Sequence, residues 1–412
     1  MPDPPWDTIV LGAGAAGLLA AERSALRGRR TLLLEKNRKA GVKILMSGGT
    51  RCNLTQSCDR REIAEAFGAG KRFLYPALGR LGPDELVAMF EGEGLATKVE
   101  ATGKVFPVSD RALDVQRTLL AMLARSGAEL ALDEPALEVD RRDDGFVVRT
   151  ARRELRTHKL IICVGGQSYP GCGTVGDGYA WARHFGHTIV QPRPSLVPLT
   201  SAEPWLAELK GVTLDDVRVS VVCDDQKKPL AERRGGLLFT HFGLSGPAVM
   251  DVSRAVTERP QAGGWRLRCD FLPASSEEDL TNQIADNAAA EGRRGVLGLV
   301  SEWLPKRLAE ALLDHARTPR DRNLAELAKG ERSRLIEAIK RTPVALSGSL
   351  GFKKAEVTAG GVTLAEVNPK TLESRLAPGL HFAGEVLDLD GPIGGYNFTA
   401  AFATGALAGE SV

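Results

Sequence analysis

The sequence lacks the features that mark several common classes of protein. Its six cysteines are scattered without a C-x-x-C pair, so neither a zinc site nor a redox dithiol is indicated. No apolar run is long enough to cross a bilayer, and the N-terminus lacks the charged and apolar regions of a signal peptide. The net charge of +2 gives no independent argument for a nucleic-acid partner. We therefore expect a cytoplasmic protein with reduced thiols that binds neither a metal nor a membrane.

The chain of 412 residues is too long for one ordinary domain. A proline-marked segment at 191–195 separates a glycine-rich first part from strand-like runs and then helical patterns. Near Ala355 the glycine-rich character returns and lasts to the C-terminus. This order predicts an α/β fold in which a discontinuous dinucleotide-binding domain, 1–193 and 355–412, carries an inserted α+β domain at 194–354.

The first part of the chain begins with the pattern of a dinucleotide-binding unit. A short apolar run at 8–11 is followed by a glycine-rich turn, an Ala/Leu-rich helical stretch and a second apolar run at 31–34. Glu35, with Lys36 beside it, then stands where an acid accepts a hydrogen bond from a ribose hydroxyl. The strand, the helix and the acid at their usual distances make this pattern specific. The predicted cofactor contacts of the turn are Gly12, Ala13, Gly14, Ala15, Ala16 and Gly17.

Each glycine of this turn has a physical task. Gly12 lets the strand turn sharply into the helix, Gly14 lets bare backbone approach a pyrophosphate, and Gly17 lets the helix pack closely on the strand. The N-terminus of the helix then faces the phosphates with free N–H groups and a partial positive charge. A glycine-rich turn that binds nothing is the alternative, and the complete pattern argues against it.

Glycines gather again after a later strand and before the last helix. The apolar run at 159–164 is expected to be a central strand, and an Ala/Gly-rich helix is expected from about 397 to 408. A helix N-terminus aimed at the N1–C2=O edge of a flavin stabilises the charge that reduction places there. Glu385 is placed to hold a sugar or ribityl hydroxyl, although these glycines also suit a simple turn into a helix. The predicted contacts are Gly165, Gly166, Gly384, Glu385, Asp390, Gly391, Gly394, Gly395, Tyr396 and Asn397.

Six motifs together resemble the BaiN/RdsA family of FAD-dependent oxidoreductases, in the order that the family has them. Two departures from the family pattern are Thr50, where a third glycine is usual, and Cys163–Val164, where alanine and threonine are usual. Cys163 and Val164 are therefore not credited with the contacts of that threonine. The matching motifs lie at residues 43–55, 173–179, 195–199, 238–247, 357–362 and 382–391.

The resemblance implies a glutathione-reductase-like Rossmann domain that binds FAD without a covalent bond. It also implies that the inserted domain is a barrel with added helices that covers the flavin. Activities attributed to the family differ: amine oxidation, a reduction in bile-acid breakdown, and reduction of a uridine in large-subunit ribosomal RNA. The substrate therefore stays open between ribosomal RNA and a small molecule.

The glycine-rich segment at 41–55 reads as neither strand nor helix, and its residues 47–53 are the best candidate for contact with the flavin ring. Arg51 is expected to balance the charge of reduced flavin or to bind an anionic substrate. Cys52 is a candidate acid that protonates a substrate carbon, with a small packing residue as the alternative. His241 is a second candidate acid or anion binder, with a structural role as the alternative. The predicted cofactor contacts of the segment are Lys43, Ser47, Gly48, Arg51, Cys52 and Asn53.

The sequence has a single dinucleotide fingerprint, so NAD(P)H would have to reduce the flavin from a transient site that is not a Rossmann fold. The leading hypothesis is an FAD-dependent enzyme that uses NAD(P)H to reduce a C=C bond, with uridine in ribosomal RNA as one substrate. A small-molecule amine oxidase or ene-reductase is the second hypothesis within the enzyme class. A flavin-binding sensor or RNA-binding scaffold without turnover is the alternative outside it.

Overall fold

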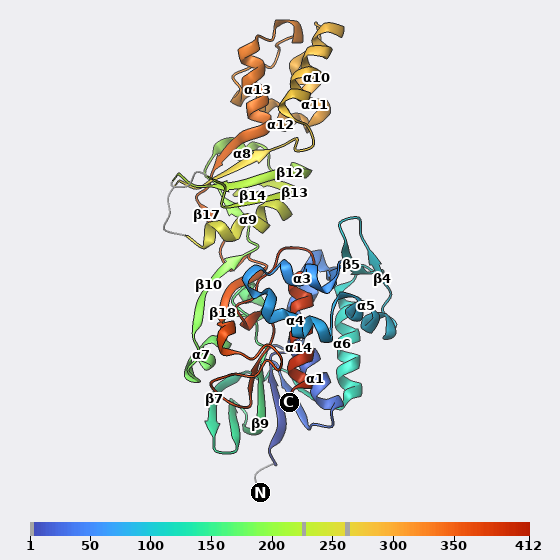
Figure 1. Cartoon of the computed structure of the whole chain (residues 1–412), viewed down its shortest axis with the longest axis vertical. Coiled ribbons are helices and arrows are strands. Elements are labelled where there is room, and N and C mark those ends of the chain that lie inside the picture. The colour runs from blue at the N-terminus through green and yellow to red at the C-terminus, as the bar shows by residue number, and fades with distance from the viewer. Residues whose placement is uncertain (1–3, 225–227, 260–263) are drawn as a thin grey trace. The chain divides into compact units, whose positions relative to one another are not determined.

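The chain forms two compact units, which are described separately (Figure 1). Unit 1 consists of Met1–Pro194 and Glu356–Val412, and unit 2 consists of Ser195–Ala355. The computed structural model describes residues 4–224, 228–259 and 264–412.

The core of unit 1 is a sheet whose central strands run parallel. The order β6-β2-β1-β9 is extended by β19, which pairs with the second half of β9. Strand β2 is buried throughout and contains three leucines, as expected for a strand that is covered on both faces. All three predicted apolar runs of this unit lie in the sheet. The bounds are β1 Trp6–Leu11, β2 Thr31–Leu34, β6 Glu129–Ala131, β9 Glu154–Ile162 and β19 Leu380–Phe382.

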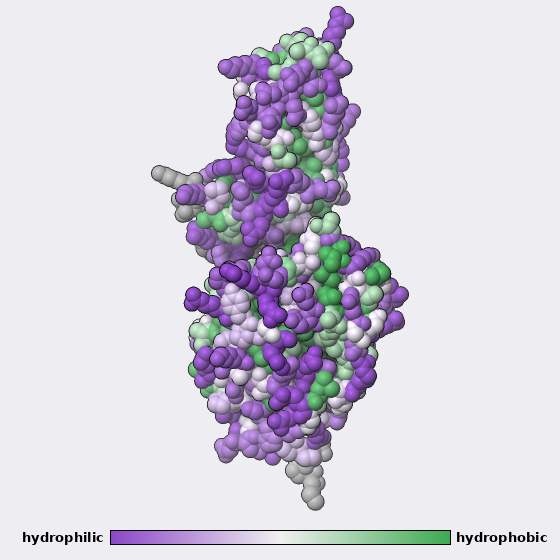
Figure 2. Space-filling model, turned by 45° about the vertical axis from the view of Figure 1, so that its right-hand side comes forward, coloured by the Kyte–Doolittle hydropathy of each residue, from purple (hydrophilic) through white to green (hydrophobic). Residues whose placement is uncertain are grey.

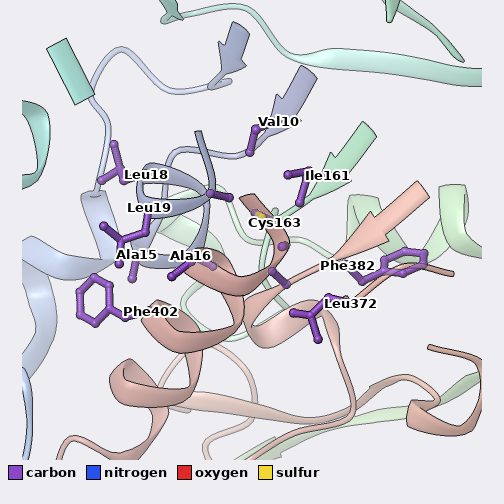
Figure 3. Close-up of a cluster of buried hydrophobic side chains, with 14 of the residues drawn as sticks. Val10, Ala15, Ala16, Leu18, Leu19, Ile161, Cys163, Leu372, Phe382 and Phe402 are labelled. Carbon is purple, nitrogen blue, oxygen red and sulfur yellow. The ribbon is translucent and has the colours of Figure 1, made fainter. Parts of the chain in front are cut away.

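Two helices, α1 (Ala15–Leu26) and α14 (Tyr396–Glu410), pack against each other at backbone distance. A Cβ added to Gly405 would lie 2.2 Å from the carbonyl oxygen of Ala16, and Gly409 is crowded in the same way one turn later. The absence of a side chain at these positions therefore permits the close approach. Figure 3 shows this core, where side chains of α1 and α14 gather beside those of β1, β9 and β19. The first and last parts of the chain thus form one hydrophobic core.

The remaining elements of unit 1 surround this sheet. Strands β7 and β8 form an antiparallel meander with β9, β3-β5-β4 form a small sheet, and β10 pairs with β18. The further strands are β3 Thr55–Gln56, β4 Thr97–Val99, β5 Lys104–Pro107, β7 Ala136–Arg142, β8 Gly145–Thr150, β10 Ile189–Ser195 and β18 Val357–Val362. The further helices are α2 Val42–Met46, α3 Arg60–Glu65, α4 Lys71–Arg80, α5 Pro83–Gly92, α6 Ala112–Ser126 and α7 Asp177–His184.

Unit 2 contains an antiparallel sheet that closes on itself. The strand order is β16-β15-β12-β13-β14-β11-β17. The end strands β16 and β17 follow each other in the chain, and the two residues between them bond opposite edges of the sheet. Leu346 N–H donates to Trp265 O, next to β15, at 2.9 Å, and Ser347 N–H donates to Thr200 O of β11 at 2.8 Å. The implied barrel is therefore present. Its strands are β11 Leu199–Thr200, β12 Thr213–Val222, β13 Ala231–Thr240, β14 Gly243–Ser245, β15 Arg266–Asp270, β16 Thr342–Ala345 and β17 Gly348–Ser349.

Several helices of unit 2 begin at a proline or at a capping residue. The run of helices begins at Glu277 behind Ser276, whose hydroxyl accepts from the N–H of Asp279, and Pro305 precedes α12. Leucine and isoleucine side chains of α10 to α13 join one buried cluster with the barrel. The bounds are α8 Pro204–Glu208, α9 Pro247–Thr257, α10 Glu277–Ala290, α11 Val296–Trp303, α12 Lys306–His315 and α13 Lys329–Arg341.

The glycine-rich segment at 41–55 differs from its prediction. It contains the short helix α2 and the 3-10 turn η1 (Ser47–Thr50) and ends in β3. Short helical turns of this kind have too few apolar residues to show a helical period.

The surface of the protein that Figure 2 shows is mostly hydrophilic, with small hydrophobic patches. Among the described residues, no helix has both the length and the apolar character needed to cross a bilayer.

Candidate functional site

The turn between β1 and α1 is tight at two glycines and open at the third. A Cβ on Gly12 would lie 2.8 Å from the carbonyl oxygen of Cys163, and one on Gly17 only 1.8 Å from the carbonyl oxygen of Gly12. A Cβ on Gly14 would meet no described atom within 4 Å. The open space lies at the N-terminus of α1, whose first turn carries no acidic side chain and no side-chain cap among the described residues. The residues present therefore fit a pyrophosphate, the group that such an N-terminus binds.

Glu35 lies where the sequence places it, at the end of β2 beside the turn. Its carboxylate is buried and accepts hydrogen bonds from the backbone N–H of Ala13 at 2.8 Å and from Asn37 N and Nδ2, both at 2.8 Å. Lys36 next to it forms a 2.5 Å ion pair with Asp177, at the start of α7. Three segments far apart in sequence thus meet at the C-terminal edge of the parallel strands, where α/β sheets bind their ligands.

A second polar cluster surrounds Glu385. Lys43 of α2 forms an ion pair with Glu385 and donates to Ser168 Oγ at 2.7 Å. Ser168 Oγ in turn donates to Glu385 at 2.5 Å, and Thr358 N–H donates to the same carboxylate at 2.8 Å. The structure therefore brings together two predicted contacts that are 342 residues apart, Lys43 and Glu385. These donors fix the orientation of the Glu385 carboxylate.

The turn that follows α2 has an unusual backbone. Gly48 and Gly49 have φ values of 54° and 66°, and two residues with side chains share the left-handed region, Thr50 at 71° and Cys52 at 61°. A β-branched residue is strained in this conformation. Thr50, which stands where the family usually has a third glycine, thus occupies a position where glycine would remove strain. Ser47 supports the turn from the other end by donating to Ile44 O at 2.8 Å.

Asn53 joins this segment to the N-terminus of α14. Its amide donates to Thr55 O at 2.9 Å and accepts from Gly395 N–H at 3.0 Å. A Cβ on Gly395 would lie 2.4 Å from the carbonyl carbon of Thr55, so only glycine permits the approach. At the same N-terminus, the Asn397 amide bonds the backbone N–H and O of Gly391, at 2.8 and 2.9 Å. The glycine-rich segment at 41–55 and the glycines before α14 therefore lie side by side in space.

The other predicted contacts of this region lie on the loop after β9 and on the segment at the start of α14. Gly165 has a φ of 73°, and a Cβ on Gly166 would lie 2.4 Å from Thr358 Oγ1, so Gly166 packs against β18. Asp390 is buried at 8% exposure, and Tyr396 is the first residue of α14. Gly394 has a φ of 132°. The glycines thus have structural reasons to be glycine in addition to their predicted role at the cofactor.

Arg51 is already paired within unit 1. Its guanidinium bonds Glu100 at 2.7 Å and Asp110 at 3.4 Å, and it lies 4.0 Å from the centroid of the Phe106 ring. The hydrogen bond with Glu100 is the main cause that raises the pKa of Arg51. The side chain is 38% exposed, so an anion can still reach it. Its charge toward a flavin or substrate is nevertheless partly balanced by two carboxylates.

The Cys52 thiol is less suited to proton transfer than its sequence setting indicates. Cys52 is 0% exposed and belongs to the hydrophobic core of unit 1. Burial raises the pKa of Cys52 to about 12, and a hydrogen bond with Ser47 opposes the shift. A buried thiol with a raised pKa is usually an inert packing group. The structure therefore favours the alternative that the sequence left open for Cys52.

We expect Cys52→Ala to leave both half-reactions within about threefold of the native rates, because an acid contributes about 10²–10⁴-fold only when it touches the reacting atoms. Anaerobic stopped-flow measurements of flavin reduction by the donor and reoxidation by the substrate test this. A loss in the substrate step alone, with the donor step unchanged, would restore Cys52 as the proton donor.

His241 lies in unit 2, at the turn between β13 and β14. The side chain is exposed, and its ring meets Phe242 edge-on at 5.0 Å. An exposed imidazole is free to take part in proton transfer or anion binding. In the described ranges, no group of His, Cys, Asp and Glu side chains is placed to hold a metal ion.

Sequence reasoning missed several residues that build the site. Ser168 and Thr358 orient Glu385, Asn37 orients Glu35, and Thr404 Oγ1 accepts from Gly384 N–H at 3.0 Å. Ser168 and Thr358 are 190 residues apart and bond each other through Ser168 N–H and Thr358 Oγ1. Each stands close to a glycine pair in the sequence, and Thr358 also lies in the matching motif at 357–362.

Comparisons with known proteins agree with this geometry. The HI0933-like protein Rossmann domain family matches residues 6–411. A ribosomal RNA dihydrouridine synthase of Escherichia coli K12 is 33% identical over 399 residues, which cover 97% of this chain and 96% of that protein. A 3-dehydro-bile acid delta(4,6)-reductase of Clostridium scindens is 33% identical over 409 residues, which cover 98% of each protein.

Solved structures share the fold at much lower identity. A 3-ketosteroid delta1-dehydrogenase of Sterolibacterium denitrificans has a TM-score of 0.53 and 14% identity, covering 99% of each chain. The Sdh1 complex of Mycobacterium smegmatis has a TM-score of 0.51 and 15% identity, covering 99% of this chain and 68% of that chain. The Rossmann fold, the FAD cofactor and the resemblance predicted from the sequence are confirmed. The chain belongs to the HI0933-like family and is an FAD-dependent oxidoreductase.

Proposed function

We propose that this enzyme reduces the C=C bond of a uridine in ribosomal RNA to give dihydrouridine, with NAD(P)H as electron donor. The observation that carries the proposal is the nearly full-length match to the synthase of Escherichia coli, at 33% identity over 97% of this chain. A second ribosomal RNA dihydrouridine synthase, from Haemophilus influenzae, is 31% identical over 97% of this chain. An RNA substrate would place the enzyme in the cytoplasm, as the cysteine usage leads us to expect.

The proposed reaction adds a hydride to one carbon of the double bond and a proton to the other. NAD(P)H supplies the two electrons and becomes NAD(P)⁺, and bound FAD supplies the hydride chemistry between donor and substrate. In this proposal the N-terminus of α1 binds the pyrophosphate, Glu35 binds a ribose hydroxyl, and Glu385 binds a ribityl hydroxyl. The N-terminus of α14 stabilises negative charge on the reduced ring. His241 is the proposed proton donor, because its side chain is exposed whereas Cys52 is buried.

We further propose that unit 2 is the substrate domain and covers the flavin. The support comes from β18, the strand of unit 1 that follows the return of the chain from unit 2. Thr358 of β18 lies near the return of the chain to unit 1 at Glu356, and its N–H donates to Glu385. The chain therefore returns from unit 2 directly beside a predicted FAD contact. A domain tethered there is well placed to exclude water and control access.

The proposal is tested with purified enzyme under anaerobic conditions. We expect NADH or NADPH to bleach the flavin, and unmodified ribosomal RNA then to reoxidise it with formation of dihydrouridine. A small-molecule ene-reductase is the second candidate, favoured by the match to the bile acid reductase at 33% identity over 98% of this chain. Reoxidation by a steroid enone but not by RNA would support that candidate. Bleaching by an amine would point to an oxidase, and no bleaching by any donor would indicate a sensor or scaffold.

A further inference from the structure

Tyr179 has a buried hydroxyl group without a partner. The residue lies in the first turn of α7 and is 2% exposed. Within the described part of the chain, its hydroxyl oxygen has no hydrogen-bond partner. Buried hydroxyl groups are nearly always paired, so this one calls for an explanation.

The first turn of α7 lies next to the candidate cofactor segments. A Cβ on Gly178 would lie 2.8 Å from Val164 and 3.0 Å from Val386, the neighbours in sequence of Gly165 and Glu385. Asp177, one residue earlier, pairs with Lys36 behind Glu35. The turn that carries Tyr179 is therefore packed between the loop after β9 and the 3-10 turn η6 (Gly384–Val386).

The Tyr179 hydroxyl stays protonated, and so remains a donor. Burial is the main cause that raises the pKa of Tyr179, and the charges of Glu385 and Asp388 raise it further. Glu385 itself is already engaged by Lys43, Ser168 and Thr358. The charge of Glu385 thus acts on Tyr179, while no described residue accepts a hydrogen bond from the Tyr179 hydroxyl.

We propose that Tyr179 is a further FAD-binding residue, whose hydroxyl donates a hydrogen bond to an oxygen that bound FAD places beside Glu385. The proposal rests on the placement of FAD along the turn after β1 and Glu385, and it holds whichever substrate the enzyme reduces. The fold carries an unpartnered hydroxyl in the free protein because cofactor binding supplies its acceptor. Loss of the hydroxyl then has opposite effects on the free protein and on the complex.

The test is Tyr179→Phe, which keeps the ring and removes only the oxygen. We expect the dissociation constant for FAD, measured by fluorescence titration of the apoprotein, to rise about tenfold, the equivalent of one hydrogen bond. We expect the apoprotein to melt at the same or a higher temperature, because a buried unpaired group has been removed. The matched control is Thr8→Val on β1, which removes another buried hydroxyl that has no partner among the described residues. It should leave the dissociation constant unchanged.

An unchanged dissociation constant in Tyr179→Phe would overturn the proposal, as would a lower melting temperature of the apoprotein together with weaker binding. Glu385→Gln distinguishes a wrong role for Tyr179 from a wrong placement of FAD. If Glu385→Gln weakens FAD binding and Tyr179→Phe does not, the role of Tyr179 alone is wrong. If neither variant changes the affinity, the placement of FAD beside Glu385 is wrong as well.

Discussion

A Gly14→Val variant should fold normally and purify without FAD. The backbone of Gly14 has φ −82° and ψ −169°, which any residue adopts, and an added Cβ meets no described atom within 4 Å. The apoprotein therefore tolerates the side chain. The same open space is the predicted approach of the pyrophosphate to the N-terminus of α1, so two extra methyl groups there would exclude the cofactor. Absorbance of the flavin and circular dichroism of the purified protein measure the two effects separately.

The neighbouring glycine provides the contrast. Gly17→Val should fail to fold, because its Cβ would lie 1.8 Å from the carbonyl oxygen of Gly12. Gly14→Ala, with a smaller side chain, should lose less FAD affinity than Gly14→Val. A yellow Gly14→Val protein with full FAD content would show that the pyrophosphate lies elsewhere.

Removal of unit 2 should abolish substrate turnover and spare FAD binding. Every predicted FAD contact lies in unit 1, which has its own hydrophobic core. The strands at the junction also suit a short connection. Thr363 N–H donates to Thr188 O, and a Cβ on Gly360 would lie 2.5 Å from Gln191 O, so β10 and β18 run in opposite directions. Replacing Ser195–Ala355 with a short Gly/Ser linker therefore joins two adjacent strand ends.

The truncated protein should remain yellow and lose all reaction with the substrate, and it should reoxidise faster with oxygen if unit 2 covers the ring as proposed. The native enzyme with His241→Ala is the matched control, since it removes the proposed acid and keeps the cover. Only the substrate step should slow in that variant. Native substrate kinetics in the truncated protein would refute the assignment of unit 2 as the substrate domain.

The elements with strong local patterns were predictable from the sequence. The β1–α1–β2 unit follows from its spacing of glycines and apolar runs, and the helices between Glu277 and Arg341 follow from their good formers and prolines. The residues that form ion pairs with the candidate site residues were not predictable, because these pairs depend on tertiary contacts. The pairing of Arg51 with Glu100, which weakens its case as a free anion-binding group, is one example.

The burial of Cys52 was likewise not predictable from the sequence. Its neighbours in sequence are polar and glycine-rich, which indicates an exposed loop, yet the thiol is fully buried. The left-handed backbone at Cys52, with a φ of 61°, is part of the turn that places it there. Backbone conformations of this kind in residues other than glycine leave little trace in a single sequence. The chemical role of a residue in such a turn therefore has to be judged from the structure.

The most direct test of the central claim is nucleotide mass mapping of ribosomal RNA from a strain in which the gene is deleted. We predict that one uridine position in the deletion strain lacks the two-hydrogen mass increment of dihydrouridine. The native gene should restore this increment. The Gly14→Val gene should not restore it, because the reduction requires FAD. Ribosomal RNA with an unchanged mass map in the deletion strain would contradict the proposed substrate.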